Sequence, residues 1–268
     1  MRVAKLERQR RDWEELAEFN PEWAVLSEPE ARFVGWDLDE FFRRGGDQIE
    51  RTMAVASGLG VPRRLGSVLD FGCGVGRLSR ELGGRFESYV GVDISAGMVE
   101  RARALNDQFS NCEFLVNDRP DLSRFGDGEF DAVVSFIVLQ HMPDRDLIRR
   151  YLGEFARVLA PGGLIAFQLP SEMPLIYRVL WRKRLYRLAR ALGMSVERAH
   201  RLGLDNMTMQ ALPVEVTRRT LEGAGCEVLR VDNEPAMHGD TPIRGSVSSD
   251  YYATRAMSGE GGRPAPRP

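Results

Sequence analysis

Apolar and polar positions divide the chain into an N-terminal part with a helical pattern and a longer part in which strands and helices alternate. Residues 1–65 are polar overall, and Asp37 is a candidate N-cap for a helix that follows it. The apolar positions of this predicted helix are Phe41, Phe42, Ile49 and Met53. Gly45 and Gly46 interrupt the pattern, so we expect a kink there.

Short apolar runs, which are typical of buried strands, alternate with helical segments from residue 66 onward. The predicted strands are Ser67–Phe71, Ser88–Val92, Glu113–Val116, Phe130–Val138, Leu164–Leu169, Cys226–Val231 and Asp250–Arg255. The predicted helices between them include Gly97–Asn106, Arg145–Leu159 and Pro213–Ala224. Such alternation predicts an α/β fold built from parallel βαβ units with right-handed crossovers.

Breaks in this alternation predict how the chain is organised. A long segment separates the fifth strand from the next helix, and the C-terminal tail is rich in Gly and Pro. We therefore expect five parts: an N-terminal helical cap (1–65), the first part of the α/β core (66–170), a helical lid insertion (171–212), the C-terminal part of the core (213–256) and a disordered tail (257–268).

Composition and charge narrow the class of protein. Hydrophobic residues make up 43% of the chain, enough for a substantial core, and the formal net charge of −2 gives no global attraction to nucleic acid. No apolar run reaches membrane-spanning length, and the N-terminal segment lacks the apolar centre of a secretory signal peptide. Cys73, Cys112 and Cys226 are far apart, which argues against a disulfide framework or a zinc site. We therefore expect a cytoplasmic protein.

A glycine loop directly follows the first predicted strand. Gly72, Gly74 and Gly76 stand at alternate positions, where the missing Cβ lets the backbone turn sharply and lets a ligand approach the chain. We expect a helix to begin behind this loop. The free N–H groups of its N-terminus would then suit a carboxylate. Taken alone, the triplet also fits a tight strand–helix turn that binds no ligand.

Acidic residues around the loop indicate which ligand it would hold. Asp93 ends the second strand, where a carboxylate can accept both ribose hydroxyls of an adenosine or, alternatively, cap the next helix. Asp118 follows the third strand, where a side-chain acceptor could meet an adenine amino group. The glycine spacing differs from the dinucleotide fingerprint, and Asp70 before the loop would repel a pyrophosphate. These residues favour a ligand with ammonium and sulfonium centres.

Together these segments resemble the class I S-adenosylmethionine-dependent methyltransferases. The matching stretches are VLDFGCGVGR (68–77), GVDIS (91–95), ND (117–118), FDAVVSFIVLQHM (130–142) and RVLAPGGLIAFQLP (157–170). The resemblance implies a Rossmann-like sheet of seven mostly parallel strands, the last one antiparallel. It also implies that S-adenosylmethionine, which becomes S-adenosylhomocysteine, lies over the carboxyl ends of the first two strands.

The resemblance further implies a set of cofactor-binding residues. Asp70 and the glycine loop would hold the methionine part, Asp93 the ribose and Asp118 the adenine amino group. Arg77 would reach the cofactor carboxylate or, alternatively, form an ion pair within the protein. The full predicted set is Asp70, Gly72, Cys73, Gly74, Gly76, Arg77, Asp93, Asp118 and, beside the adenine, Ile94 and Met98.

Methyl transfer asks the protein mainly to position a nucleophile, because the sulfonium already activates the methyl group. A hydroxyl acceptor also needs a base, for which His141 and His238 are the candidates, although His141 could instead brace its loop. Trp36 and Phe42 of the cap and Tyr177 of the lid are candidate substrate-binding residues, or else simple packing residues. No metal-ligand spacing occurs, so we expect no metal.

The sequence thus predicts a transferase that methylates a hydroxyl or amine of a small molecule, such as a sugar, a glycoside or a specialised metabolite. Two alternatives stay open: a lipid-linked or macromolecular acceptor, and a non-catalytic protein that binds S-adenosylmethionine. The lid contains a basic run without acids at 174–192. This run could be a solvated helix, a site for an acidic substrate or a peripheral contact with an anionic membrane. We expect no nucleic acid partner.

Overall fold

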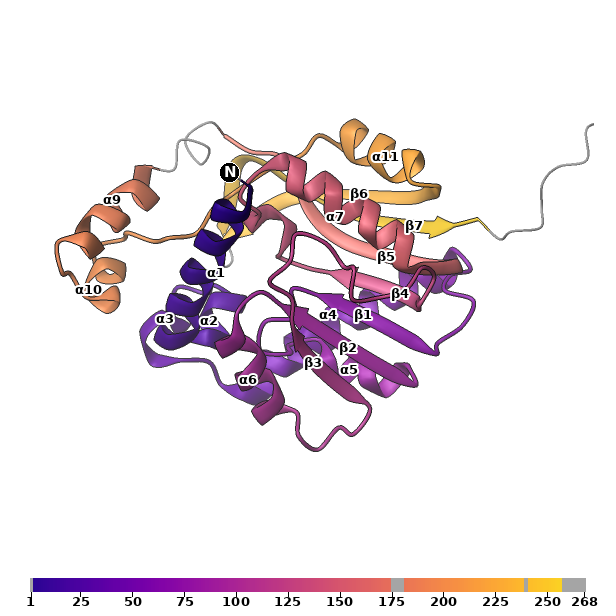
Figure 1. Ribbon diagram of the computed structural model, residues 1–268, viewed down its shortest axis with the longest axis horizontal. Helices are drawn as coiled ribbons and strands as arrows, with labels where there is room; N and C mark the ends of the chain where they lie inside the picture. The colour runs from indigo at the N-terminus through magenta and orange to yellow at the C-terminus, as the bar shows by residue number, and fades with distance from the viewer. Residues whose placement is uncertain (1, 175–180, 239–240, 257–268) are drawn as a thin grey trace, which may run out of the picture.

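A seven-stranded sheet in the order β3-β2-β1-β4-β5-β7-β6 forms the centre of the protein (Figure 1). The structure is a computed structural model that describes residues 2–174, 181–238 and 241–256. The strands are β1 (Ser67–Phe71), β2 (Ser88–Asp93), β3 (Cys112–Val116), β4 (Phe130–Ser135), β5 (Leu159–Glu172), β6 (Cys226–His238) and β7 (Thr241–Arg255). Strands β1 to β5 pair in parallel, whereas β7 is antiparallel to both β5 and β6. The predicted fold class is therefore confirmed.

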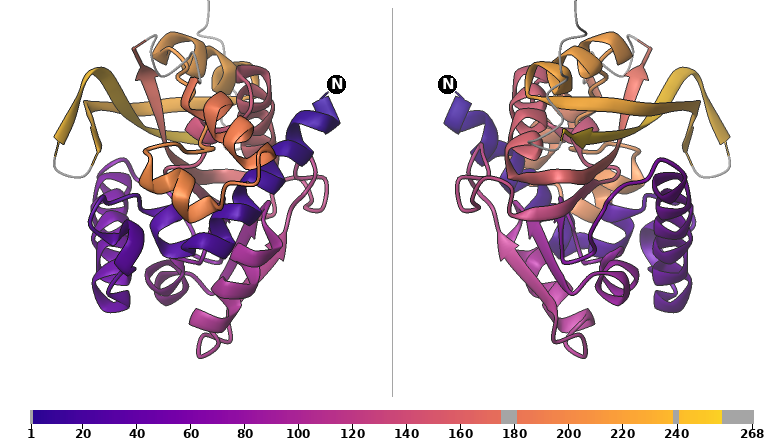
Figure 2. Two further views of the ribbon diagram at one scale, coloured as in Figure 1. Left: turned by 90° about the vertical axis from the view of Figure 1, so that its left-hand side faces the viewer. Right: turned by 90° about the vertical axis from the view of Figure 1, so that its right-hand side faces the viewer.

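Strands β4 to β7 differ from their predicted lengths by more than one residue, and β5 extends beyond its prediction at both ends. The apolar run predicted as a strand over 130–138 leaves the sheet after Ser135. Ile137 has a φ of 62°, which cannot continue a pleated strand, and the 3₁₀ helix η1 (Leu139–His141) follows. Strands β6 and β7 are longer than predicted because they pair along most of their length as a hairpin, which Figure 2 shows extending beyond the rest of the sheet.

Helices cover both faces of the sheet. On one face lie α7 (Arg145–Val158) and α11 (Val214–Gly223), and on the other lie α4 (Leu38–Gly58), α5 (Ser79–Arg85) and α6 (Ala96–Leu105). Neighbouring residues of β1 alternate between the faces, because Leu69 joins the first apolar cluster and Val68 the second. A strand that is buried on both sides needs a continuous apolar sequence, which is the pattern predicted for these strands.

Helix α4 begins as predicted but has no break at its glycines. The Asp37 carboxylate accepts the Glu40 N–H at 2.9 Å and so caps the helix. The helix continues through Gly45 and Gly46 without interruption. Gly45 instead lies against the backbone carbonyl of Arg77, where a Cβ atom would collide. The glycine permits close packing of α4 on the loop after β1.

The remaining helices gather at the edge where the parallel strands end. They are α1 (Arg2–Phe19), α2 (Pro21–Val25), α3 (Ala31–Val34), α9 (Trp181–Ala191) and α10 (Val196–Arg201). Helix α1 lies over the strand ends, and α9 and α10 lie outside α1 (Figures 1 and 2). None of the helices in the described part of the chain is long and apolar enough to cross a membrane. The predicted tail at 257–268 lies outside the described residues.

Candidate functional site

A cavity opens at the carboxyl ends of β1 to β4, beneath α1. From the predicted cofactor-binding set, the residues that line it are Gly72, Gly74, Asp93, Ile94 and Met98. Among the described residues of the lining, Asp93 is the only one with an acidic or a Lys or Arg side chain. A cavity whose single charge is negative suits a neutral or cationic ligand and opposes a pyrophosphate.

The backbone of β2 holds the glycine loop in place. The N–H groups of Gly72 and Cys73 both donate to the Val92 carbonyl, at 2.7 and 3.0 Å. Gly72 and Gly74 have φ values of 77° and 54°, which favour glycine, and a side chain at either position would collide with a valine that also lines the cavity. Helix α5 begins only at Ser79, so the helix N-terminus expected directly behind the loop lies further along the chain.

Asp93 connects the end of β2 to the glycine loop. Its Oδ2 atom accepts the Gly74 N–H and its Oδ1 atom accepts the Ser95 N–H, both at 2.9 Å. Burial raises the pKa of Asp93 to about 6, although these N–H bonds oppose the shift. The N-cap of α6 is Ser95, so the alternative role of Asp93 as the cap does not apply. Each carboxylate oxygen retains a lone pair, which fits a ribose hydroxyl as donor.

Asp70 and Arg77 lie under the loop and do not line the cavity. The Asp70 Oδ2 atom accepts the Tyr89 hydroxyl at 2.8 Å, and burial raises the pKa of Asp70 to about 7. The Arg77 Nη2 atom donates to Gln48 of α4 at 2.6 Å, and burial lowers the pKa of Arg77 to about 10. Side chains alternate along a strand, so Asp70 faces away from the side on which Phe71 lines the cavity.

The end of β3 contributes Asn117 to the cavity rather than Asp118. Asn117 is buried in the lining and its Nδ2 atom donates to the Asp121 carbonyl at 3.1 Å, whereas Asp118 is exposed. The sequence placed an acceptor at this strand end but did not decide which neighbour turns inward. Cys73 and Gly76, also in the predicted set, are not part of the lining.

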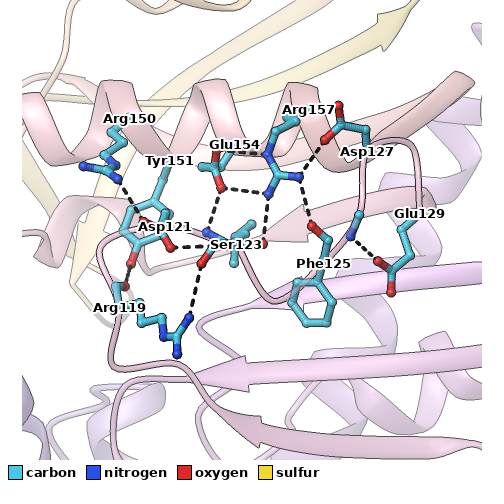
Figure 3. Close-up of polar contacts among 12 residues, drawn as sticks. Arg119, Asp121, Ser123, Phe125, Asp127, Glu129, Arg150, Tyr151, Glu154 and Arg157 are labelled. Atoms are coloured by element: carbon cyan, nitrogen blue, oxygen red, sulfur yellow. Dashed lines mark hydrogen bonds and ion pairs between the residues drawn. The ribbon is translucent and has the colours of Figure 1, made fainter.

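Side chains of α7 hold the loop that follows β3 (Figure 3). Tyr151, which lines the cavity, donates from its hydroxyl to the Arg119 carbonyl at 2.6 Å. The Arg157 guanidinium donates to the Phe125 carbonyl and forms an ion pair with Glu154, both at 2.9 Å (Figure 3). These bonds fix the β3–β4 loop against the helix and with it one wall of the cavity.

The sequence missed the cavity residues that follow β4. Phe136, Ile137 and Val138 line the cavity, although the apolar run predicted them inside a strand. Ile137 is the only non-glycine residue of the described chain with a positive φ, and its N–H donates to Gln168 Oε1 at 3.2 Å. A β-branched residue is strained in this conformation, and such strain is concentrated at functional sites. Its apolar character gave no sequence signal for the turn.

One face of α1 closes the cavity. Leu6, Gln9 and Trp13 are spaced three and four residues apart, which puts them on one side of a helix, and all three line the cavity. The Gln9 Nε2 atom also donates to the His141 carbonyl at 3.2 Å. The sequence predicted a helical cap but did not identify these residues as its inner surface.

The aromatic residues predicted to bind substrate lie elsewhere. Trp36 donates from its indole N–H to the Leu26 carbonyl at 2.9 Å, and Phe42 packs in the apolar cluster of the cap. Neither lines the cavity, because the helical cap places Trp13 there instead. Tyr177 lies outside the described residues.

His141 lies in the cavity lining, as its position after the fourth strand suggested. Its Nδ1 atom is 2.8 Å from the Thr208 carbonyl, which fixes the proton on Nδ1, so the Nε2 lone pair accepts the Gln140 amide N–H at 3.3 Å. The Trp13 ring meets the imidazole edge-on at 5.5 Å between centroids. Burial lowers the pKa of His141 to about 4, so the ring is neutral at neutral pH. His238 is the last residue of β6, and its side chain lies outside the described part of the structure.

Part of the basic run predicted in the lid pairs with acids of α1. Lys183 and Arg187 approach the Asp12 carboxylate at 2.8 and 3.3 Å. Arg190 pairs with Glu15 at 3.0 Å. Lys183 is buried, and burial lowers its pKa despite the Asp12 charge. These cations therefore dock α9 on α1, and they are not free to hold an acidic substrate.

Known proteins resemble this chain in part of its sequence and in its fold. Residues 68–163 match the model of a family described as "Methyltransferase domain". The chain is 40% identical over 100 residues to a 2-methyl-6-phytyl-1,4-hydroquinone methyltransferase from Synechocystis, and the aligned segment covers 37% of this chain and 30% of that protein. It is 36% identical over 115 residues to a trans-aconitate 2-methyltransferase from Deinococcus radiodurans, and this aligned segment covers 42% of this chain and 41% of that protein.

A solved structure extends the likeness of the fold to most of the chain. The magnesium protoporphyrin IX methyltransferase of Synechocystis, crystallised with SAH, superposes with a TM-score of 0.53 at 20% identity over 82% of this chain and 88% of that one. Residues 68–163 thus form a methyltransferase domain. The chain has the Rossmann-like fold of the class I S-adenosylmethionine-dependent methyltransferases, as the resemblance implied. The chain spans less than half the length of these two curated relatives.

Proposed function

We propose that this protein is an enzyme that transfers a methyl group from S-adenosylmethionine to a hydroxyl or amine of a small molecule. The observation that carries the proposal is the cavity at the strand ends. There the backbone of the glycine loop meets the Asp93 carboxylate, which is the one charged carboxylate, Lys or Arg side chain among the described lining residues. Curated relatives named for a hydroquinone and for trans-aconitate support a small-molecule acceptor. A cytoplasmic setting and the absence of a nucleic acid partner stay predictions of the sequence.

The lining residues fit the proposed cofactor. Asp93 accepts the ribose hydroxyls, and Asn117 Oδ1 accepts from the adenine amino group, a role that the sequence assigned to Asp118. Ile94 and Met98 flank the adenine, and the glycine loop lies along the methionine part. When bound, S-adenosylmethionine supplies a methyl group on a positively charged sulfur, which leaves as a neutral thioether. A cavity without a cationic side chain in its described lining avoids repulsion of that positive charge.

His141 orients the acceptor in this proposal. Because its pKa is about 4, the imidazole is a weak base at neutral pH, and an acceptor that donates to its Nε2 atom would take the place of the Gln140 amide N–H, which lies 3.3 Å from it. The acceptor oxygen or nitrogen would take the methyl group as the bond from methyl carbon to sulfur breaks, and His141 or water would take the acceptor proton. Trp13, edge-on to His141, forms the adjoining wall and restricts the acceptor's position.

Unpartnered oxygens near His141 favour an acceptor that donates hydrogen bonds. The Gln9 Oε1, Gln140 Oε1 and Asn206 Oδ1 atoms are buried and have no hydrogen-bond partner among the described residues. Gln140 contacts the His141 ring at 3.3 Å, and Gln9, His141 and Asn206 line a small adjoining pocket. A buried acceptor without a donor is costly, so a hydroxyl or amine that supplies the donor binds favourably.

Calorimetry and turnover test the two halves of this proposal separately. Wild-type protein should bind S-adenosylmethionine and S-adenosylhomocysteine, and it should form the latter with some members of a panel of phenols, sugars, amines and carboxylates. Gln9→Leu should raise the KM for the acceptor about tenfold, the effect of one lost hydrogen bond, and leave the cofactor Kd unchanged. Failure to bind either cofactor form contradicts methyl transfer. Turnover with a carboxylate alone contradicts the proposed acceptor class.

A further inference from the structure

Helix α9 exposes its apolar side to solvent. Trp181, Leu185 and Leu188 of α9 and Leu192, directly after it, are 44, 45, 57 and 79% exposed. At about 100° per residue these four positions fall within about 60° of one another, so they form a single stripe along the helix. We name these four residues the α9 outer face.

The same helix packs on the protein through its polar side. Lys183 and Tyr186 are buried on the side opposite the stripe, where Lys183 pairs with Asp12 and the Tyr186 hydroxyl donates to Glu15 at 2.8 Å. A surface helix normally buries its apolar stripe and exposes its charges. Helix α9 does the reverse, and a contiguous apolar surface of this kind marks an interaction site.

Arginines border the α9 outer face. Arg182 and Arg184 are exposed on α9, which contains no acid. Neither Arg184 nor Arg198 of α10 has an ion-pair partner among the described residues. Glu197 is the single acid between Trp181 and Arg201, and Arg201 pairs with it at 2.6 Å. The charge around the stripe is therefore complementary to an anionic partner.

Other exposed apolar residues lie at the same end of the molecule. Leu202 follows α10 and is 62% exposed, and Phe33 and Val34 of α3 are 48 and 85% exposed. Figures 1 and 2 place α3, α9 and α10 together at the end where the parallel strands terminate. The Arg201 guanidinium lies 5.7 Å from the centre of the Phe33 ring, which joins α10 to α3.

We propose that the α9 outer face docks this protein on a membrane surface that carries anionic lipid headgroups. The leucines enter the boundary between headgroups and acyl chains, Trp181 lies at the level of the headgroups, and Arg182 and Arg184 meet the lipid phosphates. A lipid surface suits a stripe that combines apolar side chains with flanking arginines. Burial of the apolar side chains and attraction of the arginines to anionic headgroups both favour binding in the same orientation. The proposal is independent of methyl transfer, since none of these residues lines the cavity.

Vesicle co-sedimentation of the full chain tests the proposal. We expect binding to vesicles of phosphatidylcholine mixed with phosphatidylglycerol, weaker binding to pure phosphatidylcholine, and loss of binding as salt rises. Leu188→Asp should weaken partition at least about tenfold, and Arg184→Gln about fivefold, the effect of one basic residue near an anionic surface. Trp emission should shift to the blue on binding in the wild type and not in Trp181→Phe.

Leu65→Asp is the matched control, because Leu65 is 45% exposed and precedes β1, outside α9. It should bind vesicles as the wild type does, and all variants should keep the wild-type thermal unfolding temperature, since the substituted side chains are exposed. Absence of binding to anionic vesicles overturns the proposal, as does binding that Leu188→Asp leaves unchanged. So does light scattering that shows a dimer dissociated by Leu188→Asp without any vesicle binding, because the stripe would then pair two copies of the chain.

Discussion

The Gly74 N–H donates a 2.9 Å hydrogen bond to Asp93 Oδ2, which joins the glycine loop after β1 to the acid at the end of β2. One carboxylate thus fixes the backbone of the loop and also faces the cavity. The two features that the sequence treated as separate ligand contacts are a single unit in the structure. A change at Asp93 should therefore affect both the conformation of the loop and the affinity for the ligand.

Asp93→Ala should raise the Kd for S-adenosylmethionine by about a hundredfold, because two charge-assisted acceptors are lost. It should also lower the free energy of unfolding by about 1–2 kcal/mol, because the Gly74 and Ser95 N–H groups lose their partner. Asp93→Asn, which retains one acceptor, should have an intermediate effect on both quantities. Calorimetry and chemical unfolding measure them. An Asp93→Ala protein with wild-type affinity would show that the ribose is not bound here.

The affinity for S-adenosylmethionine should fall as the pH falls through about 6. Burial raises the pKa of Asp93 to about 6 in the free protein, and the proposed ligand donates its hydroxyls to the carboxylate form. Ligand and proton therefore compete, so affinity is full above this pKa and drops about tenfold per pH unit well below it. Calorimetry between about pH 5 and pH 8 checks this, and Asp93→Asn, without a titrating group, should flatten the profile. His141 stays largely neutral over this range because its pKa is about 4.

Substitutions of Asp70 and Tyr89 should have non-additive effects on the free energy of unfolding and little effect on the Kd for the cofactor. Tyr89→Phe leaves the buried Asp70 carboxyl without its hydroxyl partner, and Asp70→Ala leaves the Tyr89 hydroxyl unpaired. Each should cost about 1–3 kcal/mol of unfolding free energy, and the double variant should cost about 1 kcal/mol less than the sum. The cofactor Kd should change far less than in Asp93→Ala. An Asp70→Asn protein of normal stability that fails to bind cofactor would return Asp70 to the role that the sequence assigned to it.

Removal of the Glu14 carboxylate should loosen α1 over the cavity. Glu14 accepts the Ser95 hydroxyl and the Ala96 N–H, both at 2.8 Å, and thereby ties α1 to the first turn of α6. In Glu14→Ala we expect faster amide exchange along α1 and a cofactor dissociation rate raised about tenfold, the effect of about 1–2 kcal/mol of lost contacts. Glu7→Ala is the control, since Glu7 is an exposed acid of the same helix. Equal exchange in both variants would contradict the role of Glu14.

Substitutions of Trp13 and Trp36 should have different effects on the KM for the acceptor. Trp13 lines the cavity beside His141, so Trp13→Ala should raise the KM for the acceptor about tenfold or more, given the contact area of an indole ring. Trp36 donates to the Leu26 carbonyl within the cap, so Trp36→Phe should lower stability and leave that KM unchanged. Steady-state kinetics with a fixed cofactor concentration measure both. The reverse pattern would place the acceptor on the outer side of the cap.

The sequence by itself determined the order of elements and the place of the cavity at the strand ends. Apolar runs bounded by turns fixed the parallel strands, and Asp37 fixed the start of α4, because strand burial and helix capping depend on neighbouring residues. Gly72 and Gly74 marked the loop, since only glycine adopts its positive φ without strain. Asp93 was found because it follows a strand at a set distance from that loop. Strand pattern, helix capping and glycine conformation depend on neighbouring residues. The place of Asp93 follows from the βαβ connection, which brings the ends of successive parallel strands to the same edge of the sheet.

Tertiary structure alone decided which side chains face the cavity. Asp70 faces away from the cavity and Asn117 faces into it. Which side chain at a strand end faces the cavity depends on how the strand packs against the helices on either side. Trp13 reaches the cavity because α1 is held on the far-off residues Ser95 and Lys183, contacts that no local pattern encodes. The exposed stripe of α9 follows from the same cause. Once the charges of that helix pair with α1, its apolar side has no place in the core.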